Sequence, residues 1–428
     1  MLLRLFYSLV LFLVSPLLLA TLYKPKKGKP TFGSRWKEHF GFVDPTGHDN
    51  PIWFHAVSVG EVIAATPIIK SMHASYPEQT IIITTTTATG AQQAEKLPGK
   101  ILHRYMPIDF AWCVRRFIKT IQPKALFIME TELWPNTLHQ AQRANIPITL
   151  INARLSERSC RRYLKVPPLC HLLMHPLDQI LCQYTQDAER FIRLGVSKHK
   201  VTVTGSVKFD IHIDESIPIK AKQLRAELGA NRPTWIAAST HSGEDELLYQ
   251  AHKQILLTHP EALLIIVPRH PERFDEVYEL GRSMALSVGR RTVLADNKQH
   301  QVYLGDTMGE LLLLLASADV CFMGGSLIGD KVGGHNLLEP AALSLPIISG
   351  PSYFNFAQIA DKLLANDALF IAQEPQAISH QVLEFLNNKS RADHAGRQAK
   401  TIVEDNRGAV SKTLSAVSQY FDQQGATG

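Results

Sequence analysis

Carboxylates follow two short apolar runs in the N-terminal half of the chain. The loop HAVSVGE ends in Glu61, and the loop METELWPN carries Glu130 and Glu132. A carboxylate at a strand end can act as a general base. Glu61 can instead complement the dipole of the helix that it begins, and Glu132 can cap the helix that follows it. Glu130 lies nearer the end of its run, which favours a position facing a ligand.

A third loop, VTGSVKFD, closes this half of the chain with Lys208 after a strand-end glycine. A lysine at this position can bind a phosphate or a carboxylate. It can equally be a solvated residue of a linker, and the spacing leaves both interpretations open.

The loops of the C-terminal half favour an anionic ligand. The segment VPRHPERF places Arg269, His270 and Arg273 around a predicted helix start, which is a plausible phosphate site. The segment 305–310 and the glycine-rich loops at 324–327 and 333–340 can bring backbone amides close to an anion. These loops match neither a P-loop nor a GxGxxG dinucleotide fingerprint. His241, His270 and His335 are far apart in sequence and lack the spacing of metal ligands, which argues against a metal site.

The elements that position these loops are predicted to alternate between strands and helices, because Val- and Ile-rich runs alternate with amphipathic segments. Such runs indicate a mainly parallel, doubly wound sheet. The predicted strands of the first half are residues 52–56, 81–86, 101–105, 125–129, 148–151, 179–183 and 201–204. Those of the second half are residues 235–239, 263–267, 302–304, 320–323, 346–348 and 369–372.

Two such series predict two doubly wound domains. The charged stretch 209–233 has no strand signal, so the boundary is placed near Asp214. We expect an anchor at 1–23, an N-terminal domain at 24–213 and a C-terminal domain at 214–428, with the last helix packing back on the first domain. Ligands of such sheets bind beyond the carboxyl ends of the strands, which here predicts a site in the cleft between the domains.

Composition and the N-terminal segment predict the compartment of the protein and its attachment to a membrane. The chain has 428 residues, a net charge of +6 and five cysteines, without a CxxC pair. This favours a reducing compartment and disfavours a disulfide framework or a zinc cluster. The uncharged run 5–23 is long enough to span a bilayer. A cleaved signal peptide is the alternative, but Lys24, Lys26, Lys27 and Lys29 follow the run and favour a single-pass anchor with a cytoplasmic chain.

The ordered motifs HAVSVGE, METELWPN, VTGSVKFD, VPRHPERF, GDTMGEL and GGHNLLEPA resemble the 3-deoxy-D-manno-octulosonic acid (Kdo) transferases of lipopolysaccharide assembly, which are GT-B glycosyltransferases. The resemblance runs from the anchor to about Ala409. Leu337 departs from relatives that carry Pro in an HNPLEP version of the last motif. The implied fold is α/β of the GT-B class, with two Rossmann-like domains facing across a cleft.

The resemblance also implies roles for individual residues. Glu61 would accept a proton from the attacking hydroxyl, and Glu130 and Lys208 would stabilise the transition state. The implied reaction transfers Kdo from CMP-Kdo to the lipid A precursor on the inner leaflet of the inner membrane, with inversion and without a metal ion or other cofactor. Nucleic acid is not an expected partner. The residues that would hold the CMP group are Pro268, Arg269, Met308, Gly309, Glu310, Asn336, Leu337, Leu338 and Glu339.

Two other classes remain open on the sequence alone. One is a different GT-B enzyme, such as a UDP-sugar transferase or an epimerase, which the identity of the nucleotide would distinguish. The other is a membrane-tethered binding protein without catalysis, although proteins of that class are normally exported.

Overall fold

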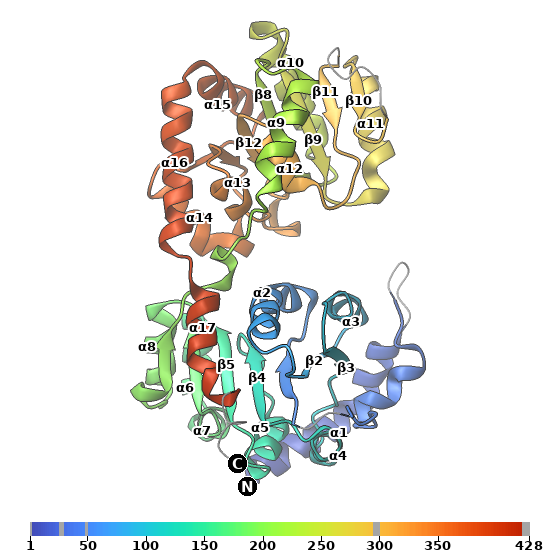
Figure 1. Ribbon diagram of the computed structural model, residues 1–428, viewed down its shortest axis with the longest axis vertical. Helices are drawn as coiled ribbons and strands as arrows, with labels where there is room; N and C mark the ends of the chain where they lie inside the picture. The colour runs from blue at the N-terminus through green and yellow to red at the C-terminus, as the bar shows by residue number, and fades with distance from the viewer. Residues whose placement is uncertain (1, 25–29, 48–49, 294–299, 422–428) are drawn as a thin grey trace. The chain divides into compact units, whose positions relative to one another are not determined.

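The computed structural model describes residues 2–24, 30–47, 50–293 and 300–421 (Figure 1). It divides into two compact units. Unit 1 comprises Met1–Asp210 and Arg407–Gly428, and unit 2 comprises Ile211–Asn406. The chain therefore leaves unit 1 slightly before the predicted boundary near Asp214 and returns to it at Arg407. Of the lysines predicted to fix the topology, Lys26, Lys27 and Lys29 lie outside the described residues.

Unit 1 is built on a seven-stranded parallel sheet in the order β3-β2-β1-β4-β5-β6-β7. Its strands consist mostly of buried apolar residues, as expected for a sheet covered on both faces. They are β1 (Ile52–His55), β2 (Ile81–Thr85), β3 (Ile101–Tyr105), β4 (Ala125–Met129), β5 (Ile148–Ala153), β6 (Gln179–Cys182) and β7 (Val201–Val203).

Helices cover both faces of this sheet because alternate strand residues point in opposite directions. Trp53 packs in a core with α4, α5, α7 and α8, whereas its neighbours Ile52 and Phe54 pack in a second core with α2 and α17. The helices of unit 1 are α1 (Leu2–Tyr23), η1 (Gly33–Phe40), α2 (Val59–Ser75), α3 (Ala88–Ala94), α4 (Ala111–Ile121), α5 (Pro135–Arg143), α6 (Glu157–Leu164), α7 (Pro167–Met174), α8 (Thr185–Arg193), η2 (Lys198–Lys200), η3 (Val207–Phe209), α17 (Ala409–Val417) and η8 (Ser418–Tyr420).

Hydrogen bonds hold the chain on unit 1 where it returns to that unit. The Asp210 carboxylate accepts hydrogen bonds from the amides of Gly408 and Val410, each at 2.6 Å. These donors lie at the start of α17, where a helix leaves backbone N–H groups without intrahelical partners. Asp210 thus caps α17 and fixes it beside the loop that carries Lys208.

Unit 2 repeats the architecture with the strand order β10-β11-β9-β8-β12-β13-β14. All of its pairings are parallel. The strands are β8 (Thr234–Thr240), β9 (Leu263–Pro268), β10 (Val288–Arg290), β11 (Val302–Leu304), β12 (Val320–Met323), β13 (Ile347–Ser349) and β14 (Leu369–Ile371). The edge strand β10 was not predicted, because three residues that include a glycine give no strand signal.

The helices of unit 2 surround a core that contains the fully buried rings of Trp235 and Tyr249. Burying a large apolar side chain contributes about 1.5–3 kcal/mol. The helices are α9 (Ser216–Leu228), α10 (Asp245–Thr258), η4 (Pro271–Arg273), α11 (Phe274–Ser283), α12 (Leu311–Ala316), η6 (Gly329–Lys331), α13 (Leu338–Ala342), η7 (Phe354–Phe356), α14 (Ala357–Leu364), α15 (Pro375–Asn387) and α16 (Lys389–Asp405).

Candidate active site

The three candidate catalytic residues all lie beyond carboxyl ends of strands in unit 1. Glu61 follows β1, Glu130 follows the adjacent strand β4, and Lys208 follows β7. Because all the strands are parallel, their carboxyl ends lie along one edge of the sheet. The charges are close enough to interact, since Glu130 influences the pKa values of both Glu61 and Lys208.

Glu61 is held in place at the start of α2. Its carboxylate accepts hydrogen bonds from the Val57 amide at 2.8 Å and from the Ser58 hydroxyl at 2.9 Å. Ser58 is the N-cap and also accepts from the Glu61 amide at 3.4 Å. This reciprocal arrangement is close to a capping box. The helix-start role considered from the sequence is therefore present.

The electrostatic environment of Glu61 also favours uptake of a proton. Burial raises its pKa, and the nearby charges of Glu132 and Glu130 raise it further, while the bonds from Val57 and Ser58 oppose the shift. A general base works best with a pKa closer to the operating pH than that of a free carboxylate. The hydrogen bonds from Val57 and Ser58 also fix the orientation of the Glu61 carboxylate.

The glycine before Glu61 has open space around it. Gly60 lies inside the first turn of α2, and its backbone is not left-handed. A Cβ at this position would meet only the Ser58 hydroxyl, at 3.8 Å. The available room, rather than backbone freedom, is what Gly60 contributes.

Glu130 and Lys208 form the second part of the cluster. Glu130 has a left-handed backbone with φ of 55°, and its amide donates to the Ile151 carbonyl at 2.9 Å. Non-glycine residues in this region of φ are strained and concentrate at functional sites. Burial lowers the pKa of Lys208, and the Glu130 charge opposes that shift. A partly buried lysine beside a carboxylate can stabilise anionic charge on a substrate.

Two positioning residues of unit 1 give no local sequence signal. Asn152 accepts through its side-chain oxygen from the Val207 amide at 3.3 Å and so holds the loop that carries Lys208. Asp109, rather than Glu132, caps α5 by accepting from the amides of Asn136 and Thr137 at 2.9 and 2.7 Å. The expectation that Glu132 could cap this helix is wrong.

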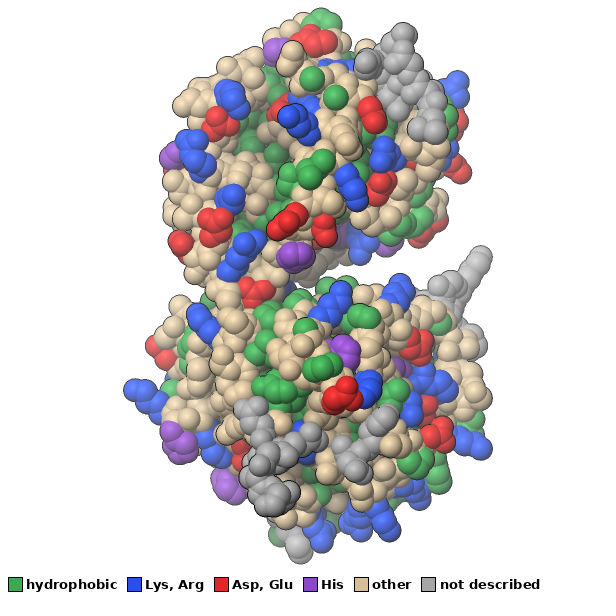
Figure 2. Space-filling model, in the orientation of Figure 1, with side chains coloured by type: hydrophobic (Ala, Val, Ile, Leu, Met, Phe, Trp, Pro, Cys, Tyr) green, Lys and Arg blue, Asp and Glu red, His purple; other side chains and the backbone are tan. Residues whose placement is uncertain are grey.

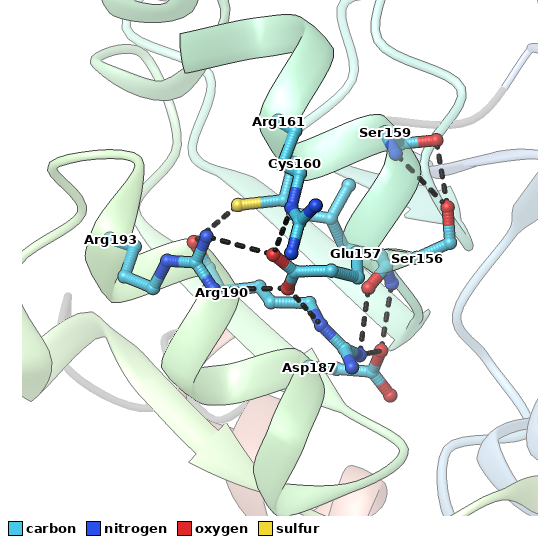
Figure 3. Close-up of polar contacts among 9 residues, drawn as sticks. Ser156, Glu157, Ser159, Cys160, Arg161, Asp187, Arg190 and Arg193 are labelled. Atoms are coloured by element: carbon cyan, nitrogen blue, oxygen red, sulfur yellow. Dashed lines mark hydrogen bonds and ion pairs between the residues drawn. The ribbon is translucent and has the colours of Figure 1, made fainter.

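Glu157 also lies in the first turn of a helix of unit 1, but its contacts differ from those of Glu61. Figure 3 shows its carboxylate among three arginines, and the N–O distances are 2.9 Å to Arg161, 3.3 Å to Arg190 and 3.0 Å to Arg193. These hydrogen bonds lower its pKa to about 2. Glu157 therefore stays ionised and serves the packing of α6 and α8.

In unit 2, Arg269, Asn336 and Glu339 come together. Arg269 is exposed just after β9, and its amide donates to the Thr240 carbonyl at 2.9 Å. Glu339 lies in the first turn of α13, where burial raises its pKa and a hydrogen bond from Asn336 and the charge of Arg269 oppose the shift. A cation beside a carboxylate can bind a phosphate and a sugar hydroxyl at once.

The other predicted CMP contacts fall into two kinds. Pro268 ends β9, Met308 is 63% exposed, and Gly309 is left-handed with φ of 85°. Leu337 and Leu338 are almost completely buried, so their side chains do not face a ligand.

Glu310 differs from the other predicted CMP contacts because its carboxylate already has partners. It pairs with Arg291 at 3.0 Å and accepts from the Thr307 hydroxyl at 2.5 Å.

Two parts of the expected phosphate site are occupied by protein groups. Arg273 is buried in an ion pair with Asp245, so only Arg269 of the two predicted arginines is available. The amides of Gly325, Ser326 and Leu327 do not face an anionic ligand, because all three donate to the buried Glu244 carboxylate at 2.7–2.9 Å. Sequence reasoning missed Glu244, because these three partners lie about eighty residues away from it along the chain.

The structure gathers three histidines that the sequence left apart. Nε2 of His241 lies 2.8 Å from Nε2 of His335, with the rings stacked, and His270 meets His241 edge-on. Burial lowers the pKa of His335 to about 4, and burial with the charges of His270, Arg273 and Arg269 lowers that of His241. Among the residues that the structure describes, no three His, Cys, Asp or Glu side chains are arranged to hold a metal ion.

Comparison with known proteins finds a family model that matches a part of each unit and relatives that match nearly the whole chain. Residues 34–211 match the 3-deoxy-D-manno-octulosonic-acid transferase (kdotransferase) family model, and residues 245–402 match glycosyl transferases group 1. The chain is 38% identical over 425 residues to a 3-deoxy-D-manno-octulosonic acid transferase of Haemophilus influenzae, covering 98% of this chain and 99% of that protein. The chain belongs to the Kdo transferase family.

A second member of the family and a solved structure extend this result. The Kdo transferase of Bordetella pertussis is 34% identical over 390 residues, which is 87% of each chain. A glycosyltransferase structure from Rickettsia africae shares the fold with a TM-score of 0.55, at 13% identity over 88% of this chain and all of that one. The predicted α/β fold of the GT-B class is confirmed, and the protein is a glycosyltransferase of the Kdo transferase family.

Proposed function

We propose that the protein transfers Kdo from CMP-Kdo to the lipid A precursor, with inversion at the anomeric carbon and without a metal ion. The observation that carries the proposal is Glu61, an oriented, half-buried carboxylate with a raised pKa, which follows a glycine with open space around it. The GT-B alternatives, a UDP-sugar transferase or an epimerase, become outcomes of the test.

In the proposed reaction, Glu61 accepts the proton of the acceptor hydroxyl as that oxygen bonds to C2 of Kdo. The bond between C2 and the phosphate oxygen breaks, and CMP leaves with the electron pair. Attack from the face opposite to the leaving group inverts C2. Lys208, oriented by its interaction with Glu130, offsets the anionic charge near the reacting carbon.

Unit 2 is assigned the donor. Arg269 supplies a charge-assisted hydrogen bond to the phosphate, and Glu339 accepts from ribose hydroxyls. Pro268, Met308–Glu310 and Asn336–Leu338 complete the proposed CMP contacts. These groups provide cationic and hydrogen-bonding contacts for the phosphodiester without a metal ion.

A cavity beside α1 supports a lipid acceptor. It has a volume of about 380 Å³ and lies between α1 residues, such as Leu11 and Leu19, and Met106, Ile108 and Trp134 of unit 1. Its lining includes Val57, whose amide donates to Glu61. An acyl chain in this cavity would bring the sugar of the acceptor near the proposed base.

The proposed location is the cytoplasmic face of the inner membrane, with α1 as the anchor. The α1 helix has 22 residues and a mean hydropathy of 2.3 over its most apolar 18-residue window. All five cysteines are free thiols inside the fold, which agrees with a reducing compartment.

The test is a product assay with the purified full chain, CMP-Kdo and tetra-acylated, bis-phosphorylated lipid A precursor. Mass spectrometry should show the precursor gaining Kdo, and the yield should survive chelation of divalent cations. Conversion only with UDP-sugars, or loss of activity on chelation that added metal restores, would contradict the proposal.

A further inference from the structure

The orientation of α1 toward the membrane can be read from the contacts that it makes with unit 1. Near the beginning of the helix, the Tyr7 hydroxyl donates to the Asp109 carboxylate, and the Ser8 hydroxyl accepts from the Asn136 side chain at 3.0 Å. At its end, the Tyr23 hydroxyl bonds to Nδ1 of His39 at 2.8 Å. Both ends of α1 therefore touch the same globular unit.

These contacts are incompatible with a helix that crosses the bilayer away from unit 1. Tyr7 and Tyr23 are sixteen residues apart, or roughly 24 Å along a helix axis, which approaches the ~30 Å thickness of a hydrocarbon core. If α1 crossed the membrane, Ser8 would lie near the face opposite to Tyr23. Its partner Asn136 belongs to α5, which also packs against the sheet of unit 1.

Partial burial follows one stripe of α1 with helical spacing. The partly covered residues include Arg4, Ser8, Leu11, Ser15, Leu19 and Leu22. The opposite face is apolar and exposed. Its members, with exposed fractions of 53–80%, are Leu2, Leu5, Phe6, Leu9, Phe12, Leu13 and Leu17. A docked helix with an unpartnered apolar face fits the surface of a lipid layer.

The surroundings of α1 have the charge and the aromatic residues of a membrane interface. Arg4 lies within electrostatic range of Arg115 and Arg143, and Figure 2 shows basic side chains gathered along the end of unit 1 where Figure 1 places α1 and α4. Trp36 and Trp112 are about half exposed. The Tyr23 hydroxyl donates to the backbone carbonyl of Trp36, which places Trp36 beside the end of α1. Anionic headgroups attract basic residues, and tryptophan is enriched at membrane interfaces.

We propose that α1 lies in the plane of the membrane, with its exposed apolar face in the lipid and both of its ends on the side of unit 1. The partner of this surface is an anionic lipid layer. This arrangement replaces the single-pass anchor expected from hydropathy alone. It rests on the proposed function only for the presence of the membrane.

Single-cysteine labelling in intact cells tests the proposal, because the five native cysteines are buried. One variant carries Leu2→Cys at the start of α1, and the other carries Leu257→Cys on α10, where Leu257 is 85% exposed. A membrane-impermeant maleimide is added before and after solubilisation. Both thiols should react only after solubilisation.

The pattern of labelling distinguishes failure of the in-plane arrangement of α1 from failure of the proposed cytoplasmic location. Reaction of Leu2→Cys from outside, with Leu257→Cys protected, would show that α1 spans the membrane and would overturn the in-plane arrangement. Reaction of both thiols from outside would place the whole chain in the periplasm. That result would contradict the cytoplasmic location while supporting the same-side placement of α1.

Oxidative crosslinking in membranes gives an independent reading. The pair Ser8→Cys and Asn136→Cys should form a disulfide, because the native side chains are in hydrogen-bond contact. The control pair Leu13→Cys and Asn136→Cys should not, because Leu13 is on the exposed face. Equal yields for the two pairs, or none for the first in the folded protein, would contradict docking of α1 on unit 1.

Discussion

The carboxyl ends of the two sheets are similar in architecture and differ in the charged groups that they carry. Unit 1 presents Glu61, Glu130 and Glu132 with Lys208, whereas unit 2 presents Arg269 and three histidines with Glu339. Each sheet has seven parallel strands with helices on its faces. The strand framework fixes where the loops meet, and the residue types in the loops decide what they can bind.

Burial disfavours the charged form of a side chain in both units, so it shifts the pKa values of acids and of bases in opposite directions. In unit 1 it raises the pKa of Glu61, so the carboxylate holds a proton more readily than a free glutamate. In unit 2 it lowers the pKa of His335 to about 4, so the imidazole is neutral at pH 7. The shift in unit 1 suits Glu61 to accept a proton from a hydroxyl. The shift in unit 2 leaves an uncharged pair of histidines that could take up a proton when an anion binds.

The largest expected effect comes from removing the proposed base of unit 1. Glu61→Gln should lower turnover by roughly 10²–10⁴-fold, the usual contribution of a positioned general base. The affinity for CMP, measured by calorimetry, should change little because Glu61 belongs to unit 1 and the assigned CMP contacts belong to unit 2.

Glu157→Gln is the matched control for this change. It alters a glutamate in the first turn of another helix of unit 1, whose partners are three arginines (Figure 3). Turnover should stay near that of the unaltered protein. An equal loss of turnover in both variants would make the effect of Glu61→Gln a general consequence of losing a carboxylate in this unit.

A smaller effect is expected from the cation of unit 2. Arg269→Ala should weaken CMP binding by about 1.5–3 kcal/mol, the contribution of a hydrogen bond to a charged group, or roughly 10–150-fold in Kd. The control is Arg282→Ala, which removes an exposed arginine of α11 that is paired with Glu279. Calorimetry on both variants shows how much of the loss in CMP affinity is specific to Arg269. Equal affinities for the two variants would remove Arg269 from the donor site.

The pH dependence of CMP binding probes the histidine cluster. A bound phosphate should raise the pKa of the His241–His335 pair from its low value, so binding takes up a proton and affinity rises as pH falls from 8 toward 6. One coupled proton gives at most about tenfold per pH unit. Titration of the CMP phosphate also contributes to this pH dependence. The remaining part of the slope should become flatter in His335→Asn. An unchanged slope in the variant would exclude the pair from anion binding.

The smallest effect concerns stability rather than chemistry. Asp109→Ala removes the side-chain cap of α5, and such losses cost about 0.5–2 kcal/mol of unfolding free energy. Urea titration should detect this loss, while CMP affinity should be unaffected because α5 belongs to unit 1. A stability equal to that of the unaltered protein would contradict the capping role.

Elements whose signal is local in sequence were predictable. Runs such as Ala125–Met129 are buried on both faces, and their ends locate Glu61, Glu130 and Lys208 without any knowledge of strand order. The glutamates of unit 1 sit near their predicted strand ends for that reason. Lys208 could not be told from a linker residue by spacing, because its electrostatic interaction with Glu130 depends on how β4 and β7 share one sheet.

Features that depend on distant partners could not be predicted. Glu244 looks like an ordinary surface glutamate, but it is fully buried and accepts from amides of the loop after β12. His241 and His335 meet because β8 and β12 are neighbours, which the order of motifs along the chain does not reveal. Arg273 was assigned to a phosphate because its partner Asp245 lies in another element.

The pH dependence of turnover at saturating substrate tests the role of Glu61 most directly. A base must be deprotonated to act, so turnover should fall as the pH drops through the pKa of Glu61, which burial places above its ordinary value of 4.5. The account predicts that this acidic limb is present in the unaltered protein and absent from the residual turnover of Glu61→Gln. An acidic limb of the same position in both proteins would contradict the account and assign the proton to another group.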